Sequence, residues 1–268
     1  MEKSALTALI ERYKADPESV YNTWFVGGEE RMKAFRSIRR GVRDTVDSIA
    51  RGTFGNDFRG SPLEVVLTAI TEQKQVFEGA AHPFYWKPKL RIPDIYENEA
   101  NKRKFGAFLE ACLTATREEQ VLAEISRLAA AQIKGLGPAV ANIVYFLHPT
   151  LVPPFNTAMV NGFNALFDDN KKLGSWDSYL AMRAAIVSAN AEVRDLLSKD
   201  LGAFAGLLFE IGSGRLVVRR PWRGGSRKTP CSWPGSTARG ARSRRRSPNA
   251  STSPAGSPMP RVTAATSG

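Results

Sequence analysis

The chain has 268 residues and a formal net charge of +12, which allows a sizeable hydrophobic core and is typical of proteins that bind nucleic acid or an anionic surface. Two cysteines are too few for a disulfide framework, or for a zinc or iron-sulfur site built from cysteines. No apolar run reaches the length of a membrane span and the start lacks the pattern of a signal peptide, so we expect a reduced, cytoplasmic protein without a membrane partner.

The first part of the chain predicts three helices. Their expected ranges are 4–14, 17–25 and 29–51. The third helix has an apolar stripe that includes Met32 and Ile49, and its other side carries four arginines. These are Arg36, Arg39, Arg40 and Arg43. They either contact phosphates or simply form a solvated helix face, and the solvated face is the simpler interpretation.

A capped helix is predicted over residues 61–78. Ser61 is its N-cap, Pro62 occupies the first helical position and Glu64 completes a capping box. The middle of this helix is apolar almost all round, which favours burial at the centre of a helical domain. Residues 79–96 then place aromatic side chains beside basic ones, a composition that suits either stacking on an unpaired base or an aromatic plug of the core.

Two further predicted helices, 98–114 and 117–131, lead into the glycine turn Gly135-Leu136-Gly137. Glycine lacks the Cβ that forbids positive φ, so the backbone can turn sharply here. An apolar helix follows, and a helix that begins in such a turn presents unpaired amides to an anion such as a backbone phosphate. The alternative is a plain interhelical turn with a glycine C-cap.

The remaining body is also helical. His148-Pro149 ends the hairpin helix, and further helices are expected over 157–167, 175–188 and 191–211. Strand patterns of period two are absent, so the predicted fold class is all-α. The only histidines, His82 and His148, are too few and too far apart for a histidine metal site, and no metal is predicted.

Residues 214–268 differ from the rest in composition. They hold 11 arginines, one lysine and no acidic residue. Residues 1–213 therefore hold 26 basic and 26 acidic residues and are formally neutral. The segment lacks apolar periodicity, which predicts a disordered tail. Two interpretations stay open: a basic arm that binds DNA phosphates, or the out-of-frame product of a GC-rich gene.

Three segments together resemble the helix-hairpin-helix DNA glycosylase superfamily, which includes endonuclease III and adenine glycosylases. They are the helix that ends in Thr-Glu-Gln at residue 73, the hairpin at 132–144 and the segment Leu-Val-Pro-Pro-Phe-Asn-Thr-Ala-Met-Val at 151–160. The resemblance covers about residues 62–167. It implies a two-lobed helical fold, double-stranded DNA as partner, recognition of an everted or damaged base in DNA repair, and no cofactor. The four-cysteine iron-sulfur cluster of endonuclease III relatives has no counterpart here.

The resemblance also implies site residues. Those for DNA binding are Lys134, Gly135, Leu136, Gly137 and Ala139 in the hairpin, and Gln73, whose side chain would enter the DNA at the target base. In the family a catalytic aspartate lies at the N-terminal end of the helix that follows the hairpin, and Asn156 occupies that position here. Asparagine cannot act as a base, but it caps a helix about as well as aspartate. The lysine nucleophile of bifunctional members is matched by Ala139, so we expect no lyase chemistry.

Cleavage of a base would need another carboxylate in place of Asn156. The nearest by sequence are Glu72, Asp168 and Asp169, and Thr68 stands where adenine glycosylases have a glutamate. We therefore expect a DNA-binding protein of glycosylase-like fold, and whether it cleaves stays open. Two alternatives remain: a helical protein-interaction module that does not bind DNA, and a glycosylase-derived enzyme that acts on modified bases.

Overall fold

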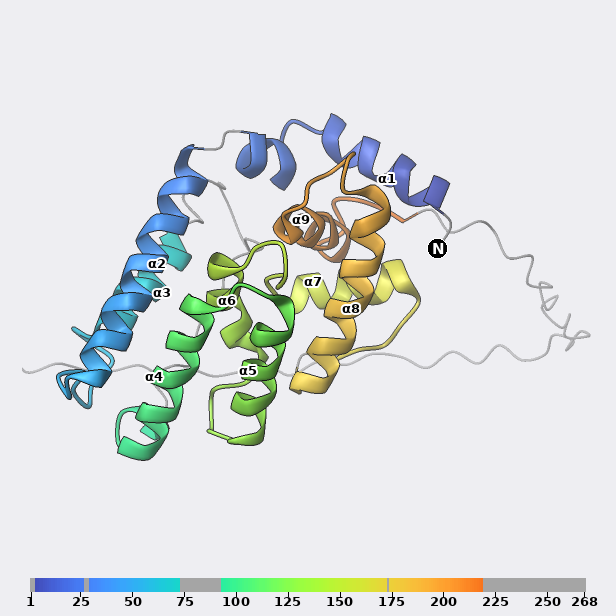
Figure 1. Ribbon diagram of the computed structural model, residues 1–268. Helices are drawn as coiled ribbons and strands as arrows, with labels where there is room; N and C mark the ends of the chain where they lie inside the picture. Colours follow the sequence, from blue (N-terminus) through green and yellow to red (C-terminus); the bar gives the residue numbers. More distant parts are fainter. Residues whose placement is uncertain (1–2, 27–28, 73–92, 173, 219–268) are drawn as a thin grey trace, which may run out of the picture. The chain divides into compact units, whose positions relative to one another are not determined.

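The structure, a computed structural model, describes residues 3–26, 29–72, 93–172 and 174–218 (Figure 1). The described residues form helices and loops without a strand, which confirms the all-α class. The α-helices among them are α1 Lys3–Ala15, α2 Glu29–Ala50, α3 Pro62–Glu72, α4 Glu99–Thr114, α5 Glu118–Ala130, α6 Ala141–Leu147, α7 Thr157–Phe167, α8 Trp176–Val193 and α9 Leu201–Gly212. A π-helical turn, Tyr21–Val26, and the 3-10 turns Pro93–Ile95 and Pro138–Val140 accompany them.

The most deeply buried helix is α9. Every one of its residues before Gly212 is buried, because the helix is apolar on all sides except at one glutamate. Helix α7 crosses it so closely that the two backbones meet at glycines. A Cβ on Gly162 would overlap the carbonyl oxygen of Leu208, and one on Gly212 would lie 2.7 Å from the amide nitrogen of Gly162. Helix α7 is therefore fixed against the centre of the core.

All the described residues belong to one compact unit. Within it, an ion pair joins Arg31 in the first turn of α2 to Asp200, the N-cap of α9. Phe35 of α2 also makes edge contacts with Tyr145 and Phe146 of α6, with ring centroids 5.6 and 5.1 Å apart. The second unit, residues 222–268, lies outside the described residues, so the predicted tail beyond Val218 does too.

Two helix boundaries differ from the predictions. The predicted second helix is a π-helical turn over Tyr21–Val26. There the Asn22 side chain donates to the carbonyls of Lys14 and Asp16, which shows how a polar side chain competes with regular helix geometry. Helix α8 continues through the predicted break at residues 189–190 to Val193, and α9 begins at Leu201 rather than at residue 191. The buried Asn190 side chain donates to the Ser198 carbonyl at 3.0 Å in the loop between them.

Helix α3 begins as predicted but is less buried than expected. The Glu64 amide donates to Ser61 Oγ at 3.4 Å, while the Glu64 carboxylate accepts from the amide of Gly60 at 2.7 Å rather than from that of Ser61. Val65, in the apolar middle of α3, has 57% of its surface exposed, and Met32 of α2 has 52%. The buried stripes of these helices are therefore narrower than the sequence predicted.

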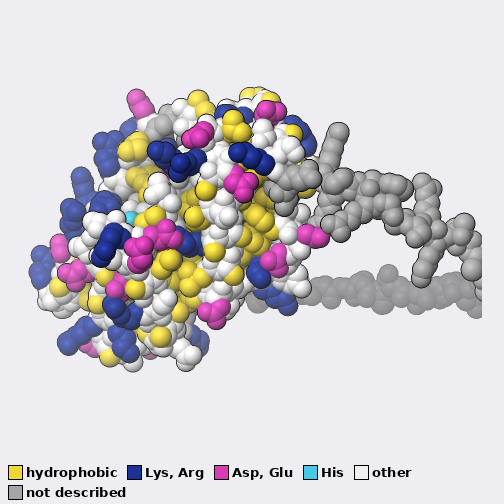
Figure 2. Space-filling view, turned by 45° about the vertical axis from the view of Figure 1, so that its right-hand side comes forward, with side chains coloured by type: hydrophobic (Ala, Val, Ile, Leu, Met, Phe, Trp, Pro, Cys, Tyr) yellow, Lys and Arg dark blue, Asp and Glu magenta, His cyan; other side chains and the backbone are white. Residues whose placement is uncertain are grey.

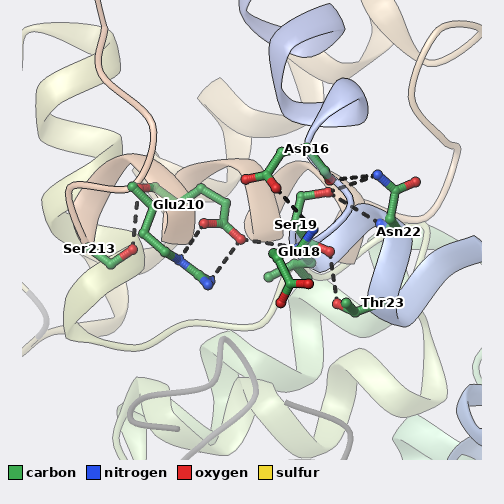
Figure 3. A network of polar contacts seen from close by, with 9 residues as sticks. Asp16, Glu18, Ser19, Asn22, Thr23, Glu210 and Ser213 are labelled. Carbon is green, nitrogen blue, oxygen red and sulfur yellow. Dashed lines mark hydrogen bonds and ion pairs between the residues drawn. The ribbon is translucent and has the colours of Figure 1, made fainter. Parts of the chain in front are cut away.

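A buried carboxylate ties the end of α9 to the N-terminal part of the chain (Figure 3). Glu210 accepts a hydrogen bond from the amide of Val20 at 3.1 Å and pairs with the Arg215 guanidinium at 2.7 Å. Burial raises the pKa of Glu210, while the Val20 amide and the Arg215 charge act in the opposite direction. This carboxylate therefore links the end of α9 to Val20, which lies 190 residues earlier in the sequence, and to the residues that directly follow α9.

This pKa shift predicts how stability depends on pH. Since the native state holds the Glu210 proton to a higher pH than the unfolded chain does, Glu210 contributes less stability as pH rises above the usual range for glutamate. The free energy of unfolding of the wild type, minus that of Glu210→Gln, should fall as pH rises above about 4 in urea titrations. Glu192→Gln, at an exposed position, serves as control. A difference that rises with pH for Glu210→Gln would refute the shift.

The folded unit continues beyond Ser213, where the sequence placed its boundary. The Leu216 side chain is buried and its amide donates to the Glu210 carbonyl at 3.0 Å. Arg12 of α1 donates to the carbonyl of Val217 at 3.1 Å. A chain shortened at Ser213 would lose these contacts, so Val218 is the earliest safe end for a shortened protein.

The surface of the folded unit carries charges of both signs. On the face shown in Figure 2, basic and acidic side chains lie next to one another around a band of hydrophobic side chains. This mixture agrees with the formal neutrality of residues 1–213. In the part of the chain that the structure describes, no helix combines the length and the apolar character needed to cross a membrane.

Candidate nucleic-acid interface

The predicted hairpin is present between α5 and α6. Gln132, with φ of 49°, adopts the left-handed conformation directly after the C-cap of α5, so no glycine caps this helix. The alternative of a plain interhelical turn stays open. A four-residue turn follows, closed by a hydrogen bond of 3.1 Å from the Leu136 amide to the Ile133 carbonyl. Gly135 is its third residue and has φ of 88°, the value that a type II turn requires there.

Gly137 differs from Gly135 in its backbone conformation. Its φ of −81° and ψ of −167° are extended backbone that any residue can adopt. A Cβ built on Gly137 would meet no atom within 4 Å. The fold therefore requires glycine at 135 but not at 137, where the missing side chain leaves open space beside the backbone.

The amides of this turn are largely unused by the fold. Among the described residues, no acceptor pairs with the amide N–H of Gly135, Gly137 or Ala139. The Leu136 amide is used in the hydrogen bond that closes the turn, and Pro138 has no amide N–H to donate. Among residues 136–139, only Gly137 and Ala139 therefore have an amide N–H that could bind a phosphate. The amide of Gly135 is a third.

The accessibility of the hairpin suits an external ligand. Gly135, Gly137 and Ala139 are half-buried and the Lys134 side chain is exposed, whereas the Leu136 side chain is buried and belongs to the core. Unpaired backbone amides next to a cation can bind an anion. Leu136 therefore offers neither an exposed side chain nor an unused amide to the predicted DNA contact.

One stripe of α8 holds both the hairpin and the loop that follows α6. Trp176, Tyr179 and Arg183 are spaced three and four residues apart, so they lie on one face of the helix. Each side chain is buried and donates a hydrogen bond to a backbone carbonyl. The acceptors are the carbonyls of Leu136 at 3.2 Å, Pro153 at 3.0 Å and Leu151 at 2.7 Å, respectively.

A second anchor comes from inside α6. The Asn142 side chain is buried and pairs with the backbone of Phe155 in both directions. Its amide donates to the Phe155 carbonyl at 3.0 Å, and its oxygen accepts from the Phe155 amide at 2.9 Å. Since Phe155 directly precedes Asn156, the start of α7 is fixed relative to the hairpin helix.

Asn156 has a structural role at the position of the family aspartate. Its side-chain oxygen accepts from the amide of Met159 at 2.9 Å and so caps α7, as the capping interpretation predicted. The residue is half-buried and carries no charge. A neutral amide in a capping bond cannot accept a proton from water, so this position supplies no general base.

The other candidate acids do not come to this position. Asp168 and Asp169 follow the C-terminal end of α7, about 18 Å from Asn156 along the helix. Asp169 is used locally, in a pair with Lys171 at 3.3 Å. The side chain of Glu72 and the whole of Gln73 lie outside what the structure describes.

Sequence reasoning missed the residues that hold this interface: Asn142, Trp176, Tyr179 and Arg183. A signal for Asn142 was present, because it is the one strongly polar side chain in an otherwise apolar helix. The signal in α8 was weaker, since its donors contact carbonyls 26 to 40 residues away in the sequence. No set of three or more His, Cys, Asp or Glu side chains among the described residues is placed to hold a metal ion.

The comparisons with known proteins were made at three levels. Neither the protein-family models, nor the curated proteins, nor the solved structures contain a match to this chain.

Proposed function

We propose that this protein binds double-stranded DNA and that the amides of Gly135, Gly137 and Ala139 hold one backbone phosphate. The observation that carries the proposal is Gly137. Its backbone conformation and surroundings would accept a side chain, yet it has none, and its N–H group has no partner among the described residues. A ligand that approaches the backbone closely gives a reason for the open space.

The neighbouring residues support an anionic ligand of this kind. Lys134 places a cation next to the turn, and the donors are backbone amides, which bind phosphate oxygens without reading the sequence. The hydrogen bonds from α8 and from Asn142 hold the hairpin rigid, so little conformational entropy is lost on binding.

The proposal does not include cleavage through Asn156, because that side chain is neutral and caps α7. The family resemblance implies that the protein recognises an everted or damaged base. We propose this recognition as the reason for DNA binding and assign no residue to it. A protein-interaction module remains the rival, and it requires no DNA affinity at all.

The test compares three glycine variants of the full chain. Gly137→Ala should leave stability unchanged or slightly higher, because alanine fits that backbone, yet weaken binding to a labelled duplex about tenfold by filling the approach to a charge-assisted bond. Gly135→Ala should cost about 1 kcal/mol of stability as well, because its φ is positive. Gly174→Ala, another open position, should change neither.

Binding is measured by fluorescence anisotropy and stability by urea denaturation. The basic residues at 214–268 are identical in all variants, so differences between them report on the hairpin. Equal affinities for Gly137→Ala and Gly174→Ala would remove the hairpin from the interface. Absence of duplex binding by the wild type at low salt would leave the interaction module.

A further inference from the structure

Helix α2 carries an arginine face that the hairpin does not explain. Arg36, Arg39, Arg40 and Arg43 are all exposed. At 3.6 residues per turn they lie within an arc of roughly 100° and span about 10 Å along the helix axis. The acidic residues of α2 all lie outside this stretch, at Glu29, Glu30, Asp44 and Asp47.

The four arginines form no ion pair in the described part of the chain. Arg36 and Arg39 donate only to backbone carbonyls, those of Met32 and Leu113, and none of the four forms an ion pair with a described carboxylate. Arg40 and Arg43 each precede an aspartate by four residues, but an arginine before its acid is the weaker order on a helix.

The arginines also repel one another. Residues three and four apart on a helix are neighbours, so Arg36 faces Arg39 and Arg40, and Arg43 faces both of them as well. Like charges at these spacings destabilise a helix. The cluster therefore weakens the fold slightly. A bound polyanion would attract each arginine and so offset the repulsion between them.

The rest of α2 indicates which polyanion fits. A membrane-surface helix must place apolar side chains in the lipid, but Ile38 and Val42, in the middle of the apolar side of α2, are fully buried in the core, although Met32 near the start of the helix is 52% exposed. Single strands are held by exposed aromatic side chains, and the one aromatic residue of α2, Phe35, packs against α6. Arginine suits phosphate because its guanidinium binds two oxygens at once.

We infer that the α2 face of Arg36, Arg39, Arg40 and Arg43 is a second DNA contact, which binds the phosphate backbone of a duplex without reading its sequence. Over about 10 Å one strand of a duplex presents about three phosphates, which is close to the four guanidinium groups of this face. The inference rests on the proposed function for its partner, but it uses a different helix from the hairpin.

The test removes three of these charges in the full chain as Arg36→Gln, Arg40→Gln and Arg43→Gln together. Arg39 is left in place because it also bonds the Leu113 carbonyl. The matched control removes three charges from scattered exposed positions, as Arg103→Gln, Arg194→Gln and Lys199→Gln. Affinity for a duplex of about 20 base pairs is measured at salt concentrations from about 50 to about 200 mM.

Log affinity falls with log salt, and the α2 triple variant should make this slope shallower by about 2 to 3. The control should make it shallower by less than about 1. Its thermal midpoint should stay the same or rise, because the repulsion is relieved. Equal slopes for the two triple variants would overturn the inference while leaving the hairpin intact. If Gly137→Ala has no effect but the α2 variant does, the hairpin proposal fails and this one stands. A wild type that binds no duplex refutes both.

Discussion

Gly162→Ala is expected to cost at least about 3 kcal/mol of stability, the upper end of what overpacking a core usually costs. The added methyl group would overlap the carbonyl oxygen of Leu208 in α9. Backbone atoms cannot move aside by a change of rotamer, so α7 and α9 would have to separate. Since a domain of this kind is stable by only about 5 to 15 kcal/mol, the loss should be evident in a urea titration.

The control for this prediction is Gly174→Ala, where an added Cβ meets no atom within 4 Å. That variant should stay within about 0.5 kcal/mol of the wild type. If Gly162→Ala were as stable as Gly174→Ala, the close backbone approach of α7 and α9 would be wrong. The placement of Asn156 at the head of α7 would then lose its main support.

Asp200→Ala should lower the free energy of unfolding by about 3 to 5 kcal/mol, because it leaves the Arg31 charge without its partner in a largely buried site. The Asp200 carboxylate pairs with Arg31 and also accepts hydrogen bonds from the Tyr145 hydroxyl at 3.0 Å and the Gly202 amide at 2.7 Å. Burial raises the pKa of Asp200, and the Arg31 charge opposes that rise. The residue thus joins α2, α6 and α9 at one point.

Asp200→Asn separates the roles of this residue. Its side-chain oxygen can still cap α9 and accept from Tyr145, so only the ion pair with Arg31 is lost, and the destabilisation should be smaller than for alanine. Asp195→Ala, at an exposed position, should be close to neutral. Thermal and urea denaturation of the three variants would rank them. An equal loss for asparagine and alanine would show that the charge alone matters.

Local features of the interface were predictable from the sequence. Glycine at 135 in a turn, asparagine as the cap of α7 and serine as the cap of α3 follow from conformational preferences of single residues. The apolar hairpin helix was likewise predicted from its periodicity, and all of α6 is buried. These features depend on neighbours in the chain, which a sequence displays directly.

The features that the sequence did not reveal depend on tertiary contacts. The targets of Trp176 and Arg183 are carbonyl groups in other segments, and no residue type identifies such a carbonyl. The two glycines of the hairpin look alike in the sequence, although only Gly135 uses a positive φ. Glu210 was detectable as a lone acid in an apolar helix, but its partner Arg215 lies where a disordered tail was predicted.

These findings change what a catalytic hypothesis would need. With Asn156 occupied as a cap and Asp168 and Asp169 at the far end of α7, the described residues supply no carboxylate among those that the sequence suggested. DNA binding through backbone amides and arginines needs no such group. The proposed binding function is therefore the one that the described geometry supports without an additional residue.

The central claim is that the free amides of the hairpin pair with a phosphate. The most direct measurement is amide hydrogen exchange by NMR on the full chain, with and without a DNA duplex at low salt. The amides of Gly137 and Ala139 should exchange rapidly in the free protein and slow markedly with DNA, whereas that of Leu136, already bonded to Ile133, should change little. Unchanged exchange at Gly137 and Ala139 under conditions where the duplex is bound would contradict the account.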